Sequence, residues 1–160
     1  MVLYTDEEIL EVVRRENPDL IAIDAPFQMP KSGWWRDSDL ALKKAGFRPL
    51  SPRFPGMQPL VRRAEKLLKL LKPYRVIEVF PRATEKILGL QKAERANQHI
   101  YDAMLCALTG KAYLEGKYRA LGKQRIILLS SSTNLSLLFN SFRASSKNFL
   151  YLSSSFSPSA

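Results

Sequence analysis

A short apolar segment that ends in a carboxylate places the strongest constraint on the fold of this chain. It spans residues 20–26, follows Pro18 and ends at Pro26. Apolar, β-branched residues between two prolines are typical of a strand buried on both faces of a sheet. Because a buried carboxylate needs a donor or a metal ion beside it, Asp24 at the end of this segment is a candidate site residue. Ligands bind at the carboxyl ends of strands in open α/β sheets, so Asp24 either lines a site or caps the next loop.

The composition indicates one globular domain. The chain has 160 residues, of which 46% are hydrophobic and 25% are charged, as in ordinary folded proteins. Its single cysteine, Cys106, excludes a disulfide framework and a cysteine-based zinc site, and favours a reducing, cytoplasmic setting. No apolar stretch approaches the roughly 20 residues of a membrane helix, so we expect no membrane partner.

The net charge of +10 is unevenly distributed. Residues 1–24 contain seven acids and two arginines and therefore carry −5, so the remainder carries +15. A surface this basic attracts polyanions, and nucleic acid is the commonest of them. A solubilising surface rich in lysine and arginine is the alternative interpretation.

The pattern along the chain alternates helices with strands. A capping box at Thr5 and Glu8 begins the first helix. Further helices are expected at 37–45, 57–71, 81–88 and 97–115, and strands at 19–24, 75–80 and 126–129. We therefore expect an α/β domain over residues 1–129. Residues 130–160 form a serine-rich tail without acidic residues or a clean period, which is either poorly ordered or aberrant, as after a shifted reading frame.

Two segments are candidates for contact with nucleic acid. The loop after Pro26 contains Trp34, Trp35 and Arg36, and exposed tryptophans stack on bases. The alternative is that the tryptophans pack this loop onto the core. The helix at 57–71 has a basic face formed by Arg62, Arg63, Lys66 and Lys69, which either contacts phosphates or is only solvated.

Three carboxylates are candidate catalytic residues. Asp24 ends one strand, Glu78 lies in another, and Asp102 lies on the helix at 97–115. Glu78 either belongs to the site or holds a neighbouring arginine such as Arg82. His99 lies one helical turn before Asp102 and is either its surface partner or catalytic. Converging acids without a cysteine or histidine cluster suit Mg²⁺ or Mn²⁺, and two such ions support phosphodiester cleavage.

Several separate segments together resemble the family called domain of unknown function 429. The segments are 18–26, 36–39, Met57, 76–82, 99–103 and 107–109. That family is regarded as predicted nucleases of ribonuclease H-like fold, and the pattern is similar to the Holliday-junction resolvase branch. The resemblance implies that Asp24 and Asp102 bind Mg²⁺ or Mn²⁺, and that Glu78 either binds the metal or supports its ligands together with Arg82. Arg82 is also a candidate for contact with nucleic acid. Arg36, Asp39 and Arg63 match family positions of unassigned role.

The chain departs from that pattern at its beginning. The superfamily's first strand contains an aspartate, usually within Gly-Ile-Asp, and this sequence has no such stretch. The expected fold is therefore an incomplete ribonuclease H-like domain, without strands 1–3, in which helices flank a mixed sheet. One edge of the strand at 19–24 would be exposed and would invite association with a second copy. The expected function is a metal-dependent nuclease. The alternatives are a non-catalytic nucleic-acid-binding domain and an inactive truncated member.

Overall fold

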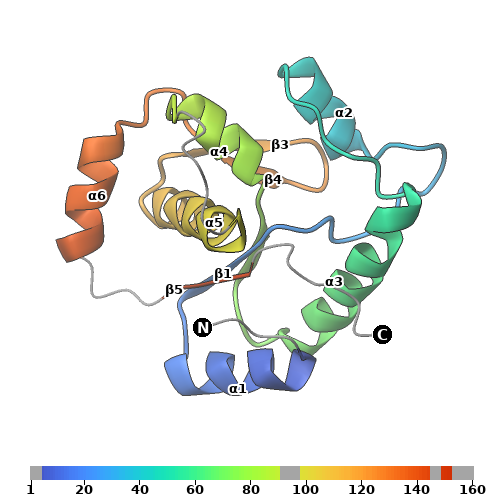
Figure 1. The fold of residues 1–160 in the computed structure, drawn as a ribbon, viewed down its shortest axis with the longest axis horizontal. Helices are drawn as coiled ribbons and strands as arrows, with labels where there is room; N and C mark the ends of the chain where they lie inside the picture. The colour runs from blue at the N-terminus through green and yellow to red at the C-terminus, as the bar shows by residue number, and fades with distance from the viewer. Residues whose placement is uncertain (1–4, 91–97, 145–148, 153–160) are drawn as a thin grey trace.

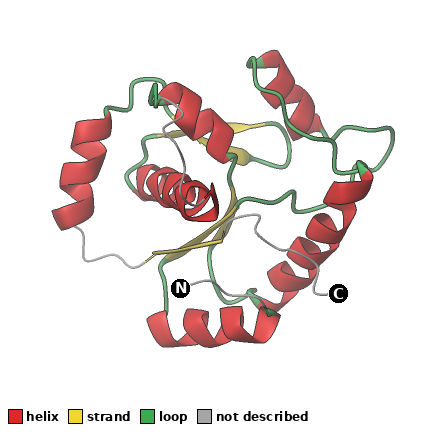
Figure 2. Cartoon of the chain, in the orientation of Figure 1, coloured by secondary structure: helices red, strands yellow, loops and turns green. Residues whose placement is uncertain are grey.

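The computed structural model describes residues 5–90, 98–144 and 149–152 and has an α/β fold (Figures 1 and 2). The helices are α1 (Asp6–Glu16), α2 (Asp37–Lys44), the 3₁₀ helix η1 (Pro55–Met57), α3 (Gln58–Leu70), α4 (Pro81–Ile87), α5 (Gln98–Leu114) and α6 (Leu135–Ala144). The strands are β1 (Leu20–Ile23), β2 (Val76–Glu78), β3 (Tyr118–Leu121), β4 (Ile126–Leu129) and β5 (Phe149–Leu152). The elements predicted up to residue 129 are confirmed within about two residues at each end, but β3, α6 and β5 were not predicted.

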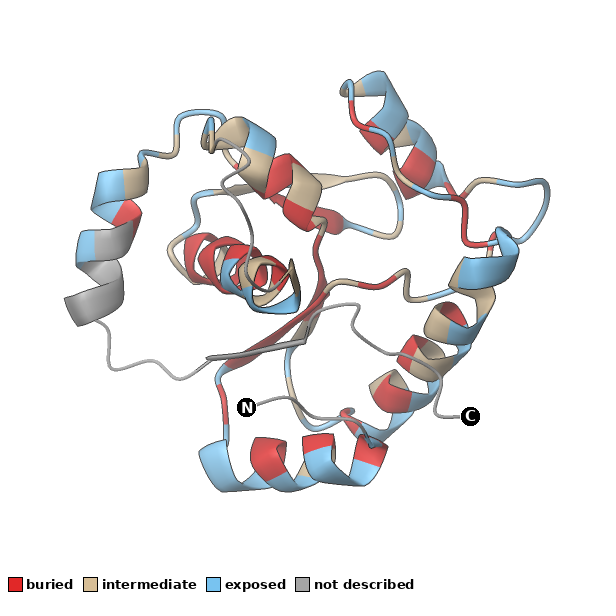
Figure 3. Ribbon diagram, in the orientation of Figure 1, coloured by how far each residue is buried: buried red, intermediate tan, exposed pale blue. Residues whose placement is uncertain are grey.

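β1 is the centre of a three-stranded parallel sheet with the order β2-β1-β5. All four of its residues are buried. Side chains alternate between the faces of a strand, and here Ile21 and Ile23 pack with α1 and α3, whereas Leu20 and Ala22 pack with Cys106 of α5. Figure 1 shows α1 and α3 on one side of this sheet and α5 on the other. Figure 3 shows the buried residues gathered on β1 and on the helix surfaces that face it.

A second layer lies beyond the carboxyl end of β2. Strands β3 and β4 form an antiparallel pair, and a parallel bridge between Val79 and Ile127 joins this pair to the chain after β2. Ile126 and Leu128 of β4 pack against Leu42 of α2 and Ala83 of α4. The second layer thus places α2 and α4 beside the ends of β1 and β2.

The turn between β3 and β4 is docked onto the beginning of α2. Gln124 Oε1 accepts hydrogen bonds from the Ser38 amide at 2.9 Å and from the Ser38 hydroxyl at 2.7 Å. Gly122 in this turn has a φ of +69°, and a Cβ added there would lie 2.6 Å from the Ser38 nitrogen. We therefore expect Gly122→Ala to lower the free energy of unfolding by about 2–4 kcal/mol, because it adds a backbone clash to the cost of a left-handed alanine.

Gly116 is the matched control for this prediction. Its φ is +73°, but a Cβ added there meets nothing within 4 Å. Gly116→Ala should therefore cost only about 1–2 kcal/mol, the conformational part alone. Urea unfolding of both variants gives the comparison, and equal losses would contradict the close packing of the turn against α2.

The chain beyond residue 130 contains regular structure that its sequence did not indicate. Leu135–Ala144 form α6, and Phe149–Leu152 form β5, which pairs with β1 in parallel along the edge opposite β2. The expectation of an exposed edge on this strand is therefore corrected: β5 occupies it, and association through an open edge loses its basis. The parts of the predicted tail at 145–148 and 153–160 lie outside the described residues.

Within the described ranges, none of the helices combines the length and the apolar character that crossing a membrane would need.

Candidate active site

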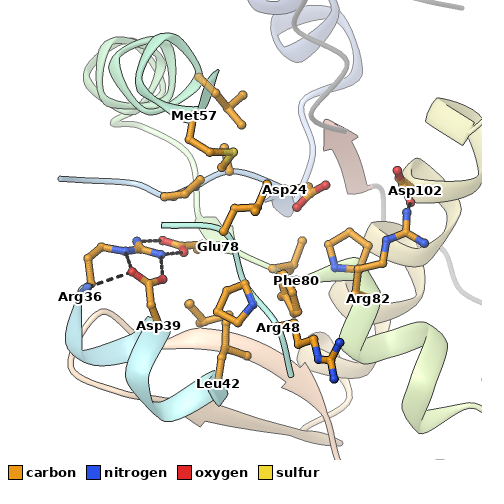
Figure 4. Close-up of a pocket in the computed structure, with 18 residues that line it drawn as sticks. Asp24, Arg36, Asp39, Leu42, Arg48, Met57, Glu78, Phe80, Arg82 and Asp102 are labelled. Atoms are coloured by element: carbon orange, nitrogen blue, oxygen red, sulfur yellow. Dashed lines mark hydrogen bonds and ion pairs between the residues drawn. The ribbon is translucent and has the colours of Figure 1, made fainter. Parts of the chain in front are cut away.

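A pocket of about 360 Å³ opens at the carboxyl ends of β1 and β2 (Figure 4). Residues 24–26 directly after β1 and residues 78–82 at the end of β2 form one part of its wall. α2 contributes Asp39 and Leu42, and α5 contributes Asp102. The pocket therefore lies where ligands bind in open α/β sheets. It brings together the three carboxylates that the sequence singled out.

Asp24, Arg82 and Asp102 lie along one side of this pocket (Figure 4). Arg82, on α4, forms an ion pair with Asp102 and a second one with Glu85 at 3.0 Å. Burial lowers the pKa of Arg82, but the hydrogen bond with Glu85 and the negative charges of Asp102, Glu85 and Asp24 together raise it. Arg82 is therefore a permanent positive charge between two helices and beside Asp24.

The two oxygens of Asp102 have different surroundings. Oδ1 accepts a hydrogen bond from Arg82 and another from Gln98 Nε2 at 2.8 Å. Among the described residues, the side-chain hydrogen bonds to this carboxylate both go to Oδ1. The side chain is buried and its orientation is fixed through Oδ1. Oδ2 is thus the oxygen that Asp102 can offer to a ligand in the pocket.

Arg36 forms a buried charged cluster with Asp39 and Glu78 on the other side of the pocket (Figure 4). Arg36 Nη2 lies 2.7 Å from Asp39 Oδ1 and 2.7 Å from Glu78 Oε1, and the Phe27 amide donates to Glu78 Oε2 at 3.0 Å. Burial raises the pKa of Glu78, and the bonds from Arg36 and Phe27 oppose that rise. Burial lowers the pKa of Arg36, but its bonds to the two carboxylates raise it overall.

This cluster changes the interpretation of two predicted residues. Glu78 does hold an arginine, but that arginine is Arg36 and not Arg82. Arg36 is 3% exposed, and four of its hydrogen bonds go from the guanidinium to Asp39 and Glu78. The prediction that Arg36 contacts nucleic acid therefore does not fit. Arg36 instead holds the loop before α2 against β2 through its ion pair with Glu78.

The charged side chains that line the pocket are of a kind that suits a divalent cation. Four carboxylates and three arginines line it, and so it has one net negative charge. Glu78 and Asp39 belong to the Arg36 cluster, whereas Asp24 and Asp102 lie on the opposite side of the pocket with Arg82. Two carboxylates are enough for Mg²⁺, which keeps several waters and takes further ligands from substrate phosphates. In the described part of the chain, no group of three or more His, Cys, Asp or Glu side chains is arranged around one point.

The residues predicted to bind nucleic acid are dispersed. Trp34 is 61% exposed, whereas Trp35 is partly buried with the Lys43 ammonium 4.0 Å from its ring centroid. Arg62 is exposed on α3. Arg63 and Lys66, however, form ion pairs with Asp6 of α1 at 2.8 and 2.9 Å. The basic face of α3 is thus partly used to hold two helices together.

Asp6 makes this helix contact dependent on pH. Burial raises its pKa, but the hydrogen bonds with Lys66 and Arg63 outweigh that effect and lower it below the ordinary 3.8. The pairing therefore contributes stability above about pH 4 and loses it as the pH falls through the lowered pKa. We expect Asp6→Asn to cost about 0.5–1 kcal/mol at pH 7, because the partners are partly exposed.

Urea unfolding between pH 7 and pH 3 tests this expectation. The difference between Asp6→Asn and the unchanged chain should shrink as the pH approaches 3. Glu11→Gln, at an exposed position of α1, is the control and should change stability by less than about 0.5 kcal/mol. A difference for Asp6→Asn that is constant across this range would contradict the ion pairing.

The other polar residues of α5 lie outside the pocket. His99 is exposed and does not line it. Cys106 is buried below the site, and burial together with the charges of Asp24 and Asp102 raises its pKa well above the ordinary value.

The sequence did not indicate Arg48 and Leu50, which line the pocket from an irregular segment. No periodic pattern marks such a segment.

The fold and this pocket define an α/β protein with a carboxylate and arginine site at the carboxyl ends of its parallel strands. Comparisons with protein-family models, with curated proteins and with solved structures find no match for the chain.

Proposed function

We propose that this protein is a metal-dependent nuclease that hydrolyses phosphodiester bonds of DNA or RNA, with Mg²⁺ or Mn²⁺ held by Asp24 and Asp102. One observation carries the proposal: these two carboxylates, one from a strand end and one from a distant helix, line the same pocket. Its net negative charge suits a cation. The strongly basic chain around it suits a polyanionic substrate.

The proposed roles follow from where each side chain lies. Asp24 and Asp102 would hold the cation, which when bound would supply an activated water and stabilise the leaving oxygen. Arg82 orients Asp102 through Oδ1 and adds a positive charge that compensates the scissile phosphate. Arg48 lines the pocket mouth and binds a neighbouring phosphate. The buried Arg36 cluster positions the wall without touching the substrate.

The resemblance noted in the sequence supports this proposal. Its matching segments are far apart in the chain, yet several of them converge on the pocket. The pocket residues that belong to these segments are Asp24, Ala25, Pro26, Arg36, Asp39, Met57, Glu78, Val79, Phe80, Pro81, Arg82 and Asp102. A ribonuclease H-like ancestry is part of the same proposal.

A second candidate is a non-catalytic nucleic-acid-binding domain. The ion pair between Arg82 and Asp102 favours it, because a guanidinium on a metal-binding carboxylate weakens the attraction for a cation. In that case the pocket would bind a phosphate through Arg82 and Arg48 and would not cleave it.

The test is an assay of cleavage by the unchanged chain on labelled DNA and RNA, single-stranded, duplex and branched. We expect cleavage with Mg²⁺ or Mn²⁺ and none with EDTA. Asp19→Asn, at an exposed position before β1, should cleave normally. Binding without cleavage under every metal condition would reject the nuclease in favour of the binding domain, and the absence of both would reject the two candidates together.

A further inference from the structure

Two neighbouring loops expose three large apolar side chains, Trp34, Leu50 and Phe54. We call this group the aromatic rim, after its two aromatic members. Their exposed fractions are 61%, 60% and 51%. Exposure of large apolar side chains to water is unfavourable in free energy, and a group of exposed ones is typical of a binding surface. Leu50 also lines the active-site pocket, so the aromatic rim begins at its mouth.

The two loops are fastened to each other. The Ser51 hydroxyl donates to the Trp34 carbonyl, and Arg53 Nη2 donates to the Pro30 carbonyl at 3.4 Å. Within the second loop, the Arg53 amide donates to the Ser51 hydroxyl at 3.1 Å, and the Phe54 amide to the Ser51 carbonyl at 2.9 Å. Trp34 and Phe54 are therefore presented from a braced backbone, which lowers the entropy lost when a ligand binds.

The surroundings of the aromatic rim are basic. Residues 40–64 contain six lysines and arginines and no acid. Of these, Arg48 and Arg53 are exposed beside the rim, and Lys31 is exposed on the other loop. Apolar rings interleaved with positive charges are complementary to a chain of bases joined by phosphates. An apolar protein partner would not need these charges.

We infer that the aromatic rim binds the unpaired bases of a single-stranded nucleic acid, with Arg48 and Arg53 on its phosphates, and guides that strand into the pocket. Base stacking on aromatic side chains needs an open base face, which a duplex hides within its own stack. This inference rests on the proposed function for the direction in which the strand runs. It adds the substrate class, namely single-stranded segments.

Binding is tested in EDTA, which separates it from cleavage. The probe is a fluorescent oligothymidylate of about 20 nucleotides, with a blunt duplex of equal length for comparison. We expect Trp34→Ala with Phe54→Ala to weaken binding of the single strand at least tenfold and to change duplex binding less than twofold. Leu137→Ala removes an equally exposed apolar side chain from α6 and should leave both affinities unchanged.

Tryptophan fluorescence locates the contact. The chain has two tryptophans, and stacking on a base should quench Trp34 alone. Quenching by the oligonucleotide should therefore disappear in Trp34→Phe and persist in Trp35→Phe, since Trp35 is held by Lys43. Circular dichroism of each variant checks that it is folded.

Equal losses of single-strand and duplex affinity would overturn the inference, and so would unchanged affinity in the double variant. If the double variant instead abolished self-association of the chain, the rim would be an interface between copies, which also overturns it. Because these measurements exclude the metal, they stand or fall separately from cleavage: a chain that binds through the rim but never cleaves rejects only the nuclease.

Discussion

Replacing Asp24 with asparagine should lower the rate of nucleic-acid cleavage by about a hundredfold to a thousandfold. The substitution keeps the shape of the side chain and removes the negative charge that faces the pocket beside Arg82 and Asp102. A cation that helps to stabilise charge in the transition state would then bind weakly and out of place, and losing one such electrostatic contact typically costs this much. Steady-state cleavage at saturating Mg²⁺ gives the comparison.

Two controls make the Asp24 result interpretable. Asp24→Asn should melt within a few degrees of the unchanged chain, since Asp24 is only partly buried, so that lost activity is not lost folding. Asp102→Asn should reduce cleavage similarly, because in the proposed function the two carboxylates hold one cation. Cleavage within threefold of the unchanged chain in both variants would show that the activity belongs elsewhere.

The largest loss of stability is expected for Arg36→Met. This change leaves the carboxylates of Asp39 and Glu78 buried without the Arg36 guanidinium that pairs with both, and both residues are less than 5% exposed. Removing one member of a buried charge cluster typically costs about 3–5 kcal/mol. Since burial raises the pKa of Glu78 and protonation removes its unpaired charge, the variant should regain part of its stability relative to the unchanged chain as the pH falls. Urea unfolding between pH 7 and pH 4 measures both effects.

A double-mutant cycle separates the ion pair from simple packing. Glu78→Gln keeps an oxygen that can accept from the Phe27 amide but removes one of the two charges. Arg36→Met with Glu78→Gln should therefore lose at least about 1 kcal/mol less than the sum of the single losses. Arg119→Met, at an exposed position on β3, serves as the control. Additive losses, or a small loss for Arg36→Met, would contradict a cluster held by charge.

The sequence was informative wherever a local pattern decides the structure. The apolar run that ends at Asp24 became the central buried strand because both of its faces are covered by helices. The capping box at Thr5 and Glu8 begins α1. The resemblance to a known family implied a shared site for Asp24, at a strand end, and Asp102, on a helix, and both residues line one pocket.

The remainder depends on contacts between distant segments. A glutamate in an apolar strand signals that a partner exists, but the choice of Arg36 over Arg82 depends on how the loop before α2 folds back onto β2. β5 pairs with β1 along the whole of that strand, although its own four residues have no alternating pattern. The fastening of the Trp34 loop by Ser51 is likewise invisible in either loop alone.

The most direct test of the central claim, that Asp24 and Asp102 share a cation, is a Mn²⁺ titration of the unchanged chain followed by electron paramagnetic resonance. We expect one saturable site, whose affinity falls at least about tenfold in Asp24→Asn and equally in Asp102→Asn, whereas Asp19→Asn binds as the unchanged chain does. Mn²⁺ affinity that is the same in all four proteins would contradict the claim.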